Sequence, residues 1–341
     1  MIRVFIVDND PAAVSGLRAI MEKSQEVIVL GSASLEGQGL ATITQNQPDV
    51  ICLQADMPGS TGLLFTQQIM MQCPTPILVL SSAVNASNPL LAAGAVDALA
   101  MPKSGLGVDD AAFSKELLRK IKVLSGVVVF KRNQANPSAS PPPANLVQPT
   151  KQQIVVIGAS TGGPQAFEAV LSKLPGTYPF PVVCVQHISH GFLNPFITWL
   201  NGKVKLPVSV ARSGDKPTVG QIYFAPDHAN LELDGLGQFT YSHAPHYLHY
   251  PNIDVTFQAI ADYYSNRAIA VLMTGMGDDG ASGLKAIALA GGITIAQDEA
   301  SCVVFGMPKI AIETGAAQKI LSLEQIGDQL CNYSKMHLNG L

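Results

Sequence analysis

Short apolar runs alternate with helical patterns along the first 132 residues. The apolar runs predict strands at Ile2–Val7, Val27–Gly31, Val50–Leu53, Ile77–Leu80 and Val96–Ala100. Apolar residues at helical spacing predict helices at Pro11–Lys23, Leu40–Gln47, Gly62–Gln72, Asn88–Gly94 and Asp109–Val123. Strands that alternate with helices imply a parallel sheet with right-handed crossovers. The pattern therefore predicts an α/β, flavodoxin-like, doubly wound domain.

The same pattern resumes in the second half of the chain. Buried strands are predicted at Ile154–Ile157, Val182–Gln186, Ile269–Met273 and Ile293–Ile295. Helices are predicted at Gln165–Leu174, Leu193–Asn201, Ile253–Tyr264, Gly280–Ala290 and Leu323–Cys331. Between them, Val208–Tyr241 contains short apolar runs separated by turn residues. This stretch predicts antiparallel hairpins inserted into a second doubly wound, Rossmann-like parallel-sheet domain.

A proline-rich stretch separates the two halves. Residues Asn136–Thr150 read NPSASPPPANLVQPT, with five prolines in fifteen residues. Such a composition precludes a regular element and favours an extended, semi-rigid spacer. We therefore predict a first domain at 1–130, a linker at 131–152 and a second domain at 153–341.

Composition narrows the class of protein. Of the 341 residues, 47% are hydrophobic and only 13% are charged, which excludes a disordered chain. No apolar run approaches the ~18 residues that a membrane span needs, so we expect no insertion into a membrane. Residues 1–132 carry 10 basic and 11 acidic groups, and residues 151–341 carry 11 and 14. Neither half has the basic footprint of a nucleic-acid-binding protein.

The cysteines and the N-terminus favour a cytoplasmic protein. The five cysteines are scattered and never form a C-x-x-C pair, so we expect neither disulfides nor a zinc site. The N-terminus reaches Asp8 and Asp10 at once, so we expect no secretory signal.

A glycine-rich turn after the first strand of the second domain carries a candidate nucleophile. Residues 154–163 read IVVIGASTGG, and Gly158 to Gly162 form a G-x-S-x-G pattern that would project the Ser160 hydroxyl from the strand end. The turn alone is equally compatible with a tight strand–helix connection that binds phosphate on helical N–H groups. It is not a dinucleotide fingerprint, because Ser160 takes the place of the second glycine.

Two more strand ends carry complementary chemistry. His187 follows the strand at Val182–Gln186, and Asp278 and Asp279 follow the strand that ends at Met273. Alone, the histidine is more often structural, and the carboxylates could simply cap a helix. Together they suit a serine esterase, since His187 could take the Ser160 proton while Asp279 fixes its tautomer. The order Ser…His…Asp argues against the α/β-hydrolases, whose order is Ser…Asp…His.

Five stretches resemble the chemotaxis-type protein-glutamate methylesterases, the CheB family. They are GASTGGP at 158–164, VQHI at 185–188, GF at 191–192, LMTGMGDDGA at 272–281 and AQDEASCVVFGMP at 296–308. The resemblance implies a serine esterase that hydrolyses γ-glutamyl methyl esters on the cytoplasmic domain of methyl-accepting receptors and releases methanol, with glutamine deamidation as a further activity. It assigns the nucleophile to Ser160, the base to His187 and the triad carboxylate to Asp279.

The resemblance also implies groups that bind the oxyanion or the substrate. The backbone N–H of Met276 takes the oxyanion-donor position, and Thr161 and His249 are further candidates. No cofactor and no metal is expected. One departure concerns residues 247–252, where YLHYPN replaces an N-R-H-R-P-S-like stretch, so that Leu248 and Tyr250 stand in place of two arginines. This change leaves open a different ester or amide substrate, or a binding module that has lost catalysis.

The first domain resembles the response-regulator receiver but lacks its phosphorylation chemistry. The acidic pair reads Asp8-Asn9, Gln54 stands at the phospho-acceptor position, and Met101 stands at the lysine position. A hydroxyl is kept at Ser81 or Ser82. Glutamine cannot form an acyl phosphate, and magnesium prefers carboxylate oxygens. We therefore expect a pseudo-receiver whose control passes through a partner, such as a histidine-kinase pathway or another regulatory protein.

Two charged residues lie close to the lost positions of this pocket. Asp56 and Lys103 are each two residues from them, which moves a side chain by several ångströms along a loop. We interpret Asp56 as a turn residue before Pro58-Gly59 rather than as a substitute acceptor.

Overall fold

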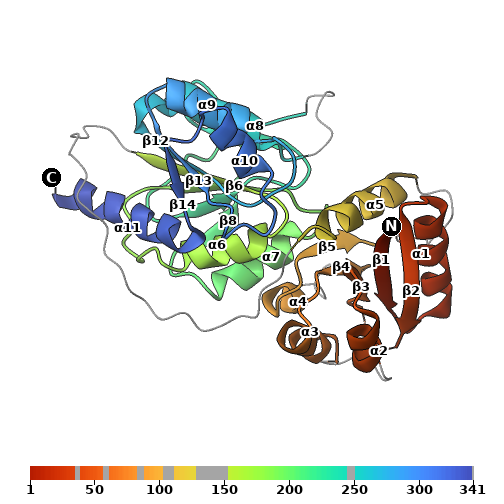
Figure 1. Cartoon of the computed structure of the whole chain (residues 1–341). Coiled ribbons are helices and arrows are strands. Elements are labelled where there is room, and N and C mark those ends of the chain that lie inside the picture. Colours follow the sequence, from red (N-terminus) through yellow and green to blue (C-terminus); the bar gives the residue numbers. More distant parts are fainter. Residues whose placement is uncertain are drawn as a thin grey trace. The chain divides into compact units, whose positions relative to one another are not determined.

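A computed structural model of the chain describes residues 1–34, 39–56, 61–82, 88–102, 111–127, 153–243 and 250–339 (Figure 1). The chain divides into two compact units, Met1–Pro137 and Ser138–Leu341. The predicted linker lies wholly outside the described residues, so its boundaries stay a prediction. Each unit is an α/β fold built on its own parallel sheet.

The N-terminal unit has the doubly wound order that the sequence predicts. Its strands are β1 (Ile2–Val7), β2 (Val27–Ala33), β3 (Val50–Gln54), β4 (Ile77–Ser81) and β5 (Asp97–Ala100). They pair in parallel in the order β2-β1-β3-β4-β5, which is the flavodoxin-like order. The helices are α1 (Pro11–Lys23), α2 (Gly39–Asn46), α3 (Thr61–Gln72), α4 (Asn88–Ala92) and α5 (Ala111–Leu124).

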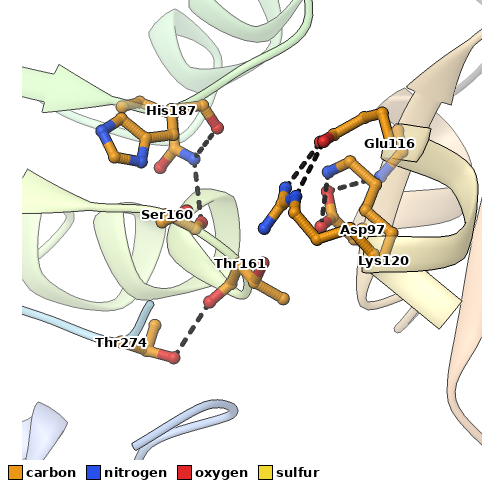
Figure 2. A network of polar contacts seen from close by, with 10 residues as sticks. Asp97, Glu116, Lys120, Ser160, Thr161, His187 and Thr274 are labelled. Carbon is orange, nitrogen blue, oxygen red and sulfur yellow. Dashed lines mark hydrogen bonds and ion pairs between the residues drawn. The ribbon is translucent and has the colours of Figure 1, made fainter. Parts of the chain in front are cut away.

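Local chemistry fixes two of these helices. Asp10 caps α1 by accepting the Ala12 N–H at 2.9 Å, and Pro11 occupies the first turn, where its missing N–H is no loss. Helix α5 buries Leu117 and Ile121. It is also joined to β5 by an ion pair of 2.7 Å between Lys120 and Asp97 (Figure 2).

The C-terminal unit has one seven-stranded parallel sheet in the order β14-β13-β12-β6-β7-β9-β8. Its strands are β6 (Ile154–Ala159), β7 (Val182–Gln186), β8 (Val208–Val210), β9 (Ile222–Phe224), β12 (Ala268–Leu272), β13 (Ile293–Gln297) and β14 (Lys319–Leu321). Strands β10 (Asn230–Leu233) and β11 (Phe239–Ser242) form a separate antiparallel pair. The helices are α6 (Gly163–Leu171), α7 (Leu193–Asn201), α8 (Ile253–Tyr264), α9 (Ala281–Leu289), α10 (Met307–Glu313) and α11 (Leu323–Asn339).

Both faces of this sheet are buried, as the continuous apolar strands predict. Along β6, Val155 and Ile157 face the core formed with α6, α7 and α11, whereas Ile154 and Val156 face the core formed with α8, α9 and α10. Figure 1 shows the two helical layers on opposite sides of the sheet. Central strands covered in this way hold their carboxyl ends in fixed positions.

The prediction for Val208–Tyr241 is partly wrong. Only β10 and β11 form an antiparallel hairpin, while β8 and β9 join the main sheet in parallel. A three-residue strand between turn residues has the same pattern of apolar residues whether it pairs in parallel or antiparallel. The sequence therefore could not distinguish the two kinds of pairing. Strand β14 and helix α10 were not predicted. None of the described helices is both long and apolar enough to cross a membrane.

Candidate active site

Three neighbouring strands bring the predicted catalytic residues to one edge of the C-terminal sheet. Strands β12, β6 and β7 are adjacent and parallel. Ser160 follows β6, His187 follows β7, and the loop after β12 carries Asp279. The carboxyl ends of parallel strands are where such sheets place reactive groups. Figure 2 shows Ser160, Thr161, His187 and Thr274 at this edge.

His187 and Asp279 form a close pair. His187 Nε2 lies 2.7 Å from Asp279 Oδ2, and both side chains are largely buried, at 18% and 16% exposed. An ionised carboxylate only accepts hydrogen bonds, so Nε2 of the neutral ring carries the proton. Nδ1 is thereby left as the proton acceptor. The ring nitrogens are exchanged relative to the serine proteases, where the carboxylate holds Nδ1.

The start of helix α8 holds Asp279 in place. Asp279 Oδ2 also accepts the Ile253 N–H at 2.8 Å, and Oδ1 accepts the Asp254 N–H at 2.9 Å. Burial acts to raise the pKa of Asp279, but the hydrogen bond and charge of His187 and these two N–H groups outweigh it. The pKa of Asp279 therefore lies below its ordinary value, and the carboxylate is ionised at neutral pH.

Asn252 starts the helix that holds this carboxylate. Its side chain accepts the Val255 N–H at 3.0 Å and caps α8, while its own N–H donates to Asn230 Oδ1 at 2.8 Å. Asn252 is the last residue of the stretch that departs from the family pattern. That stretch therefore ends in a group on which the position of Asp279 depends.

The nucleophile turn is tight and largely buried. Ser160 is 8% exposed; its N–H donates to the Thr274 carbonyl at 3.0 Å, and its carbonyl accepts the Gly163 N–H at 2.8 Å. Gly162 has a φ of +79°, which favours glycine, and a Cβ there would lie 2.6 Å from Val303 Cβ. The glycine is required by both backbone conformation and space.

Backbone hydrogen bonds from residues 304–307 hold the predicted oxyanion loop after β12. The Gly275 N–H donates to the Val304 carbonyl at 3.0 Å, and the Gly275 carbonyl accepts the N–H groups of Gly306 and Met307 at 3.1 and 2.9 Å. A Cβ on Gly306 would lie 2.7 Å from the Gly275 carbonyl oxygen, so only glycine allows this approach. Met276 lies at the exposed tip of the loop.

Thr274 links this loop to the nucleophile turn. Its Oγ1 donates to the Thr161 carbonyl at 2.9 Å and accepts the Val304 N–H at 2.9 Å (Figure 2). Its N–H donates to Gln297 Oε1 at 2.7 Å. Thr161 is itself buried, at 5% exposed. The structure thus joins the backbones of Thr161 and the Met276 loop, whereas His249 lies outside the described residues.

Two buried glutamines of the site were not predicted from the sequence. Gln186 ends β7 and Gln297 ends β13, and they are 3% and 0% exposed. Each bonds backbone groups of the loops that carry Ser160 or Met276. A polar residue that closes an apolar strand is the signal that could have identified them.

The corresponding edge of the N-terminal sheet carries the residues that stand at the receiver's phosphorylation positions. Asp8 is 8% exposed, and its Oδ1 accepts the Asp10 N–H at 2.8 Å. Within the described part of the chain, Asp8 Oδ2 and Gln54 Oε1 are buried without a hydrogen-bond partner. Burial raises the pKa of Asp8, and nearby Asp10 and Asp56 act in the same direction. Asn9 is exposed, and the Met101 N–H donates to the Ser81 carbonyl at 2.8 Å.

The interpretation of Asp56 as a turn residue is wrong for its side chain. Its carboxylate reaches the end of β4 and accepts from Ser81 Oγ, Ser82 Oγ and the Ser82 N–H, each at 2.5 Å. The carboxylate therefore joins the ends of β3 and β4. Pro58-Gly59 and Lys103 lie outside the described residues. Of the carboxylate oxygens that magnesium prefers, this pocket keeps those of Asp8, while the Asp56 carboxylate is bound to the two serines.

The comparisons with known proteins find a family for each half of the chain. The CheB methylesterase family model matches residues 155–330, and the response regulator receiver domain model matches residues 4–104. The chain is 37% identical to a protein-glutamate methylesterase/protein-glutamine glutaminase of Nitrosospira multiformis, with 97% of each chain covered. It is 38% identical to a similarly named protein of Burkholderia thailandensis, with 95% of each chain covered.

A solved structure supports the fold of the second unit. The catalytic domain of the Thermotoga maritima CheB methylesterase is 36% identical, with a TM-score of 0.52, and the match covers 54% of this chain and 100% of that one. The resemblance inferred from five sequence stretches is thereby confirmed. The chain belongs to the CheB methylesterase family and carries an N-terminal response-regulator receiver domain.

Proposed function

We propose that Ser160, His187 and Asp279 are the catalytic triad of a cytoplasmic enzyme that hydrolyses γ-methyl esters of glutamate on methyl-accepting receptors. The observation that carries the proposal is the 2.7 Å pair between His187 Nε2 and an ionised Asp279, placed one strand end from Ser160. The names of the relatives support the substrate, and their glutaminase activity supports deamidation of glutamine as a second reaction.

The reaction follows from the roles of these groups. Ser160 Oγ attacks the ester carbonyl carbon while His187 Nδ1 takes the hydroxyl proton. Asp279 stabilises the imidazolium, and the N–H of Met276, with Thr161 close by, binds the oxyanion. The C–O bond then breaks, and the imidazolium gives its proton to the leaving methoxide oxygen, which releases methanol. Water deprotonated by His187 hydrolyses the glutamyl-serine ester, which yields the glutamate carboxylate and restores Ser160.

Methanol release from premethylated receptor membranes tests this proposal. We would compare the full chain, residues 151–341 and Ser160→Ala in each. If the serine variants are silent while the parent proteins are active, the triad assignment stands. Silence of all four proteins on a demonstrably methylated receptor would overturn the receptor substrate and leave a binding module or an esterase for another substrate, such as one selected by His249 and its changed neighbours.

We further propose that the receiver domain accepts no phosphoryl group and that a partner protein sets the activity. Gln54 cannot form an acyl phosphate, and the Asp56 carboxylate already occupies the serine donors of this pocket. Incubation with magnesium and labelled acetyl phosphate should therefore leave the chain unlabelled. A triple variant, Asn9→Asp, Gln54→Asp and Met101→Lys, serves as the matched gain of function. Labelling of the parent chain would contradict the proposal.

A further inference from the structure

Gln186 is the last residue of β7 and directly precedes His187. It is polar and almost completely buried, at 3% exposed. Its Nε2 donates to the carbonyl of Ser160 at 2.9 Å and to the carbonyl of His187 at 2.8 Å. Figure 2 shows these two bonds as dashed lines that reach Ser160 and His187. One side chain therefore joins the main chains of the nucleophile and the base.

The orientation of this amide is determined by its partners. Both partners are carbonyl oxygens, which only accept, so the NH₂ group must face them and Oε1 must face away. Within the described residues, Oε1 has no hydrogen-bond partner. A buried, half-satisfied amide costs stability that an apolar side chain of similar size would not cost. Such a group is typical of a functional rather than a packing role.

The amide extends the connection between β6 and β7 beyond their backbone ladder. The last paired residues are Ala159 and Gln186, followed by the His187 N–H, which donates to the Ala159 carbonyl at 3.1 Å. Beyond this point, Ser160 enters the nucleophile turn and His187 enters its own loop. The two bonds of Gln186 join the chains at this divergence.

The glycine that opens α6 makes room for the amide. A Cβ on Gly163 would lie 1.9 Å from Gln186 Oε1 and 2.8 Å from its Cδ. Gly163 also donates its N–H to the Ser160 carbonyl that the amide holds. Unlike Gly162, which needs its positive φ, Gly163 is thus constrained by the space that Gln186 occupies. The amide and this glycine form one unit.

We propose that Gln186 is a positioning residue that sets the separation of Ser160 and His187 by binding both of their carbonyl oxygens. The proposal rests on the catalytic assignment of these two residues above. A displacement of about 1 Å between nucleophile and base costs up to about 100-fold in rate. The effect should fall on kcat, since Gln186 is buried and the change concerns the reacting groups.

Gln186→Met provides the first test, because it retains side-chain length and removes both donated bonds. In the full-length protein, we expect kcat for methanol release to fall by roughly 10- to 100-fold while KM stays within about twofold. Gln318→Met is the matched control. Gln318 also bonds two backbone groups, the Gly292 carbonyl and the Thr294 N–H, but at the opposite end of β13. It should leave kcat unchanged.

Gln186→Glu separates positioning from packing. A carboxylate cannot donate, and burial beside two carbonyl oxygens should raise its pKa, whereas the protonated form can donate one bond. The kcat ratio of this variant to the parent should therefore rise as the pH falls from about 8 to about 6. A purely structural role would give a constant ratio, and that result would overturn the proposal.

Gly163→Ala tests the same unit without removing the amide. It should displace Gln186 and lower kcat in a similar way, and a Gly163→Ala, Gln186→Ala double variant should lose little more than either single variant. Unchanged kcat in the Gln186 variants, a change in KM alone, or additive losses in the double variant would each overturn the proposal. Ser160→Ala in the same assay shows separately whether the catalytic assignment holds.

Discussion

The two sheets of this protein place a buried aspartate at the same kind of edge, with opposite results. At the carboxyl end of β1, burial raises the pKa of Asp8, whose Oδ2 has no hydrogen-bond partner among the described residues. At the C-terminal sheet, Asp279 is also buried, but His187 and two N–H groups of α8 lower its pKa. The partners of a carboxylate, rather than its place in the fold, decide in which direction its pKa moves.

The carboxyl edges of the two sheets also differ in how their hydrogen-bond donors are used. In the N-terminal unit, hydroxyl and N–H donors of Ser81 and Ser82 are occupied by the chain's own Asp56. In the C-terminal unit, hydrogen bonds such as the two made by Thr274 Oγ1 hold the backbones of the loops that carry the candidate catalytic residues. At the first edge the serine donors are used within the chain, whereas at the second edge the bonds of Thr274 hold the loops that carry Ser160 and Met276.

The largest expected effect is the loss of the nucleophile. Ser160→Ala should lower kcat for methanol release by at least about 10⁴-fold, because no other group can form the acyl intermediate. Binding of the receptor should remain, which a pull-down with premethylated receptor membranes measures. Substantial residual turnover would show that the two edges differ less in chemistry than the geometry implies.

Asp279→Asn should give the next largest effect. The amide can donate to the imidazole and so favour the wrong tautomer, which should cost about 10³- to 10⁴-fold in kcat. The neighbouring Asp278→Asn is the control, since Asp278 is exposed. Steady-state kinetics of methanol release on both variants distinguishes the two carboxylates. Equal losses would contradict the assignment of Asp279.

Removing the carboxylate of Asp56 should lower the local stability of the N-terminal sheet at the carboxyl end of β4. Asp56→Ala leaves the bonds to Ser81 and Ser82 unmade and should lower the local stability of β4 by about 1–3 kcal/mol. Hydrogen exchange of the β4 amides measures this change. Asp49→Ala, which removes a single bond to the Arg3 N–H, is the control and should leave β4 protected. Unchanged hydrogen exchange in β4 would show that the hydrogen bonds of Asp56 contribute little to the local stability of that strand.

The smallest expected effect concerns Asp254. Burial, with a smaller contribution from the charge of Asp279, raises the pKa of its carboxyl group to about 6. Between about pH 4 and pH 6 the folded state keeps this proton while the unfolded state loses it, so stability falls as the pH rises. Asp254→Asn should remove this component, about 1 kcal/mol after solvent screening. Urea unfolding at several pH values, followed by the fluorescence of Trp199, measures it. Parallel curves for parent and variant would contradict it.

The strands of the site were predictable because each is a continuous, largely β-branched apolar run, and a segment with candidate chemistry follows each of them. The strands of the N-terminal unit were predictable for the same reason, since buried parallel strands are continuous apolar runs. These apolar runs are local features of the sequence, so they can be identified without knowledge of the tertiary structure. The order β12-β6-β7 places their ends together but cannot be derived from any one segment.

The missed features depend on contacts between distant segments. Asp56 resembles a turn residue until β4 lies beside β3 and presents Ser81. Gln186 resembles the end of an apolar run until the turn at Ser160 comes within reach of its amide. Strand β8 pairs in parallel with β9 through only three residues, which leaves too little pattern to show its direction.

Because β12 follows β6 and β7 in the chain but pairs with β6, the site can be completed only late in the synthesis of each molecule. Ser160 and His187 leave the ribosome early in the second unit, but Asp279 follows about 90 residues later, several seconds at ordinary rates of synthesis. β12 must then insert beside β6, and residues 304–307 must close behind its loop. Methanol release would therefore report completed folding of the whole second unit, and an incomplete nascent chain would leave its receptors methylated.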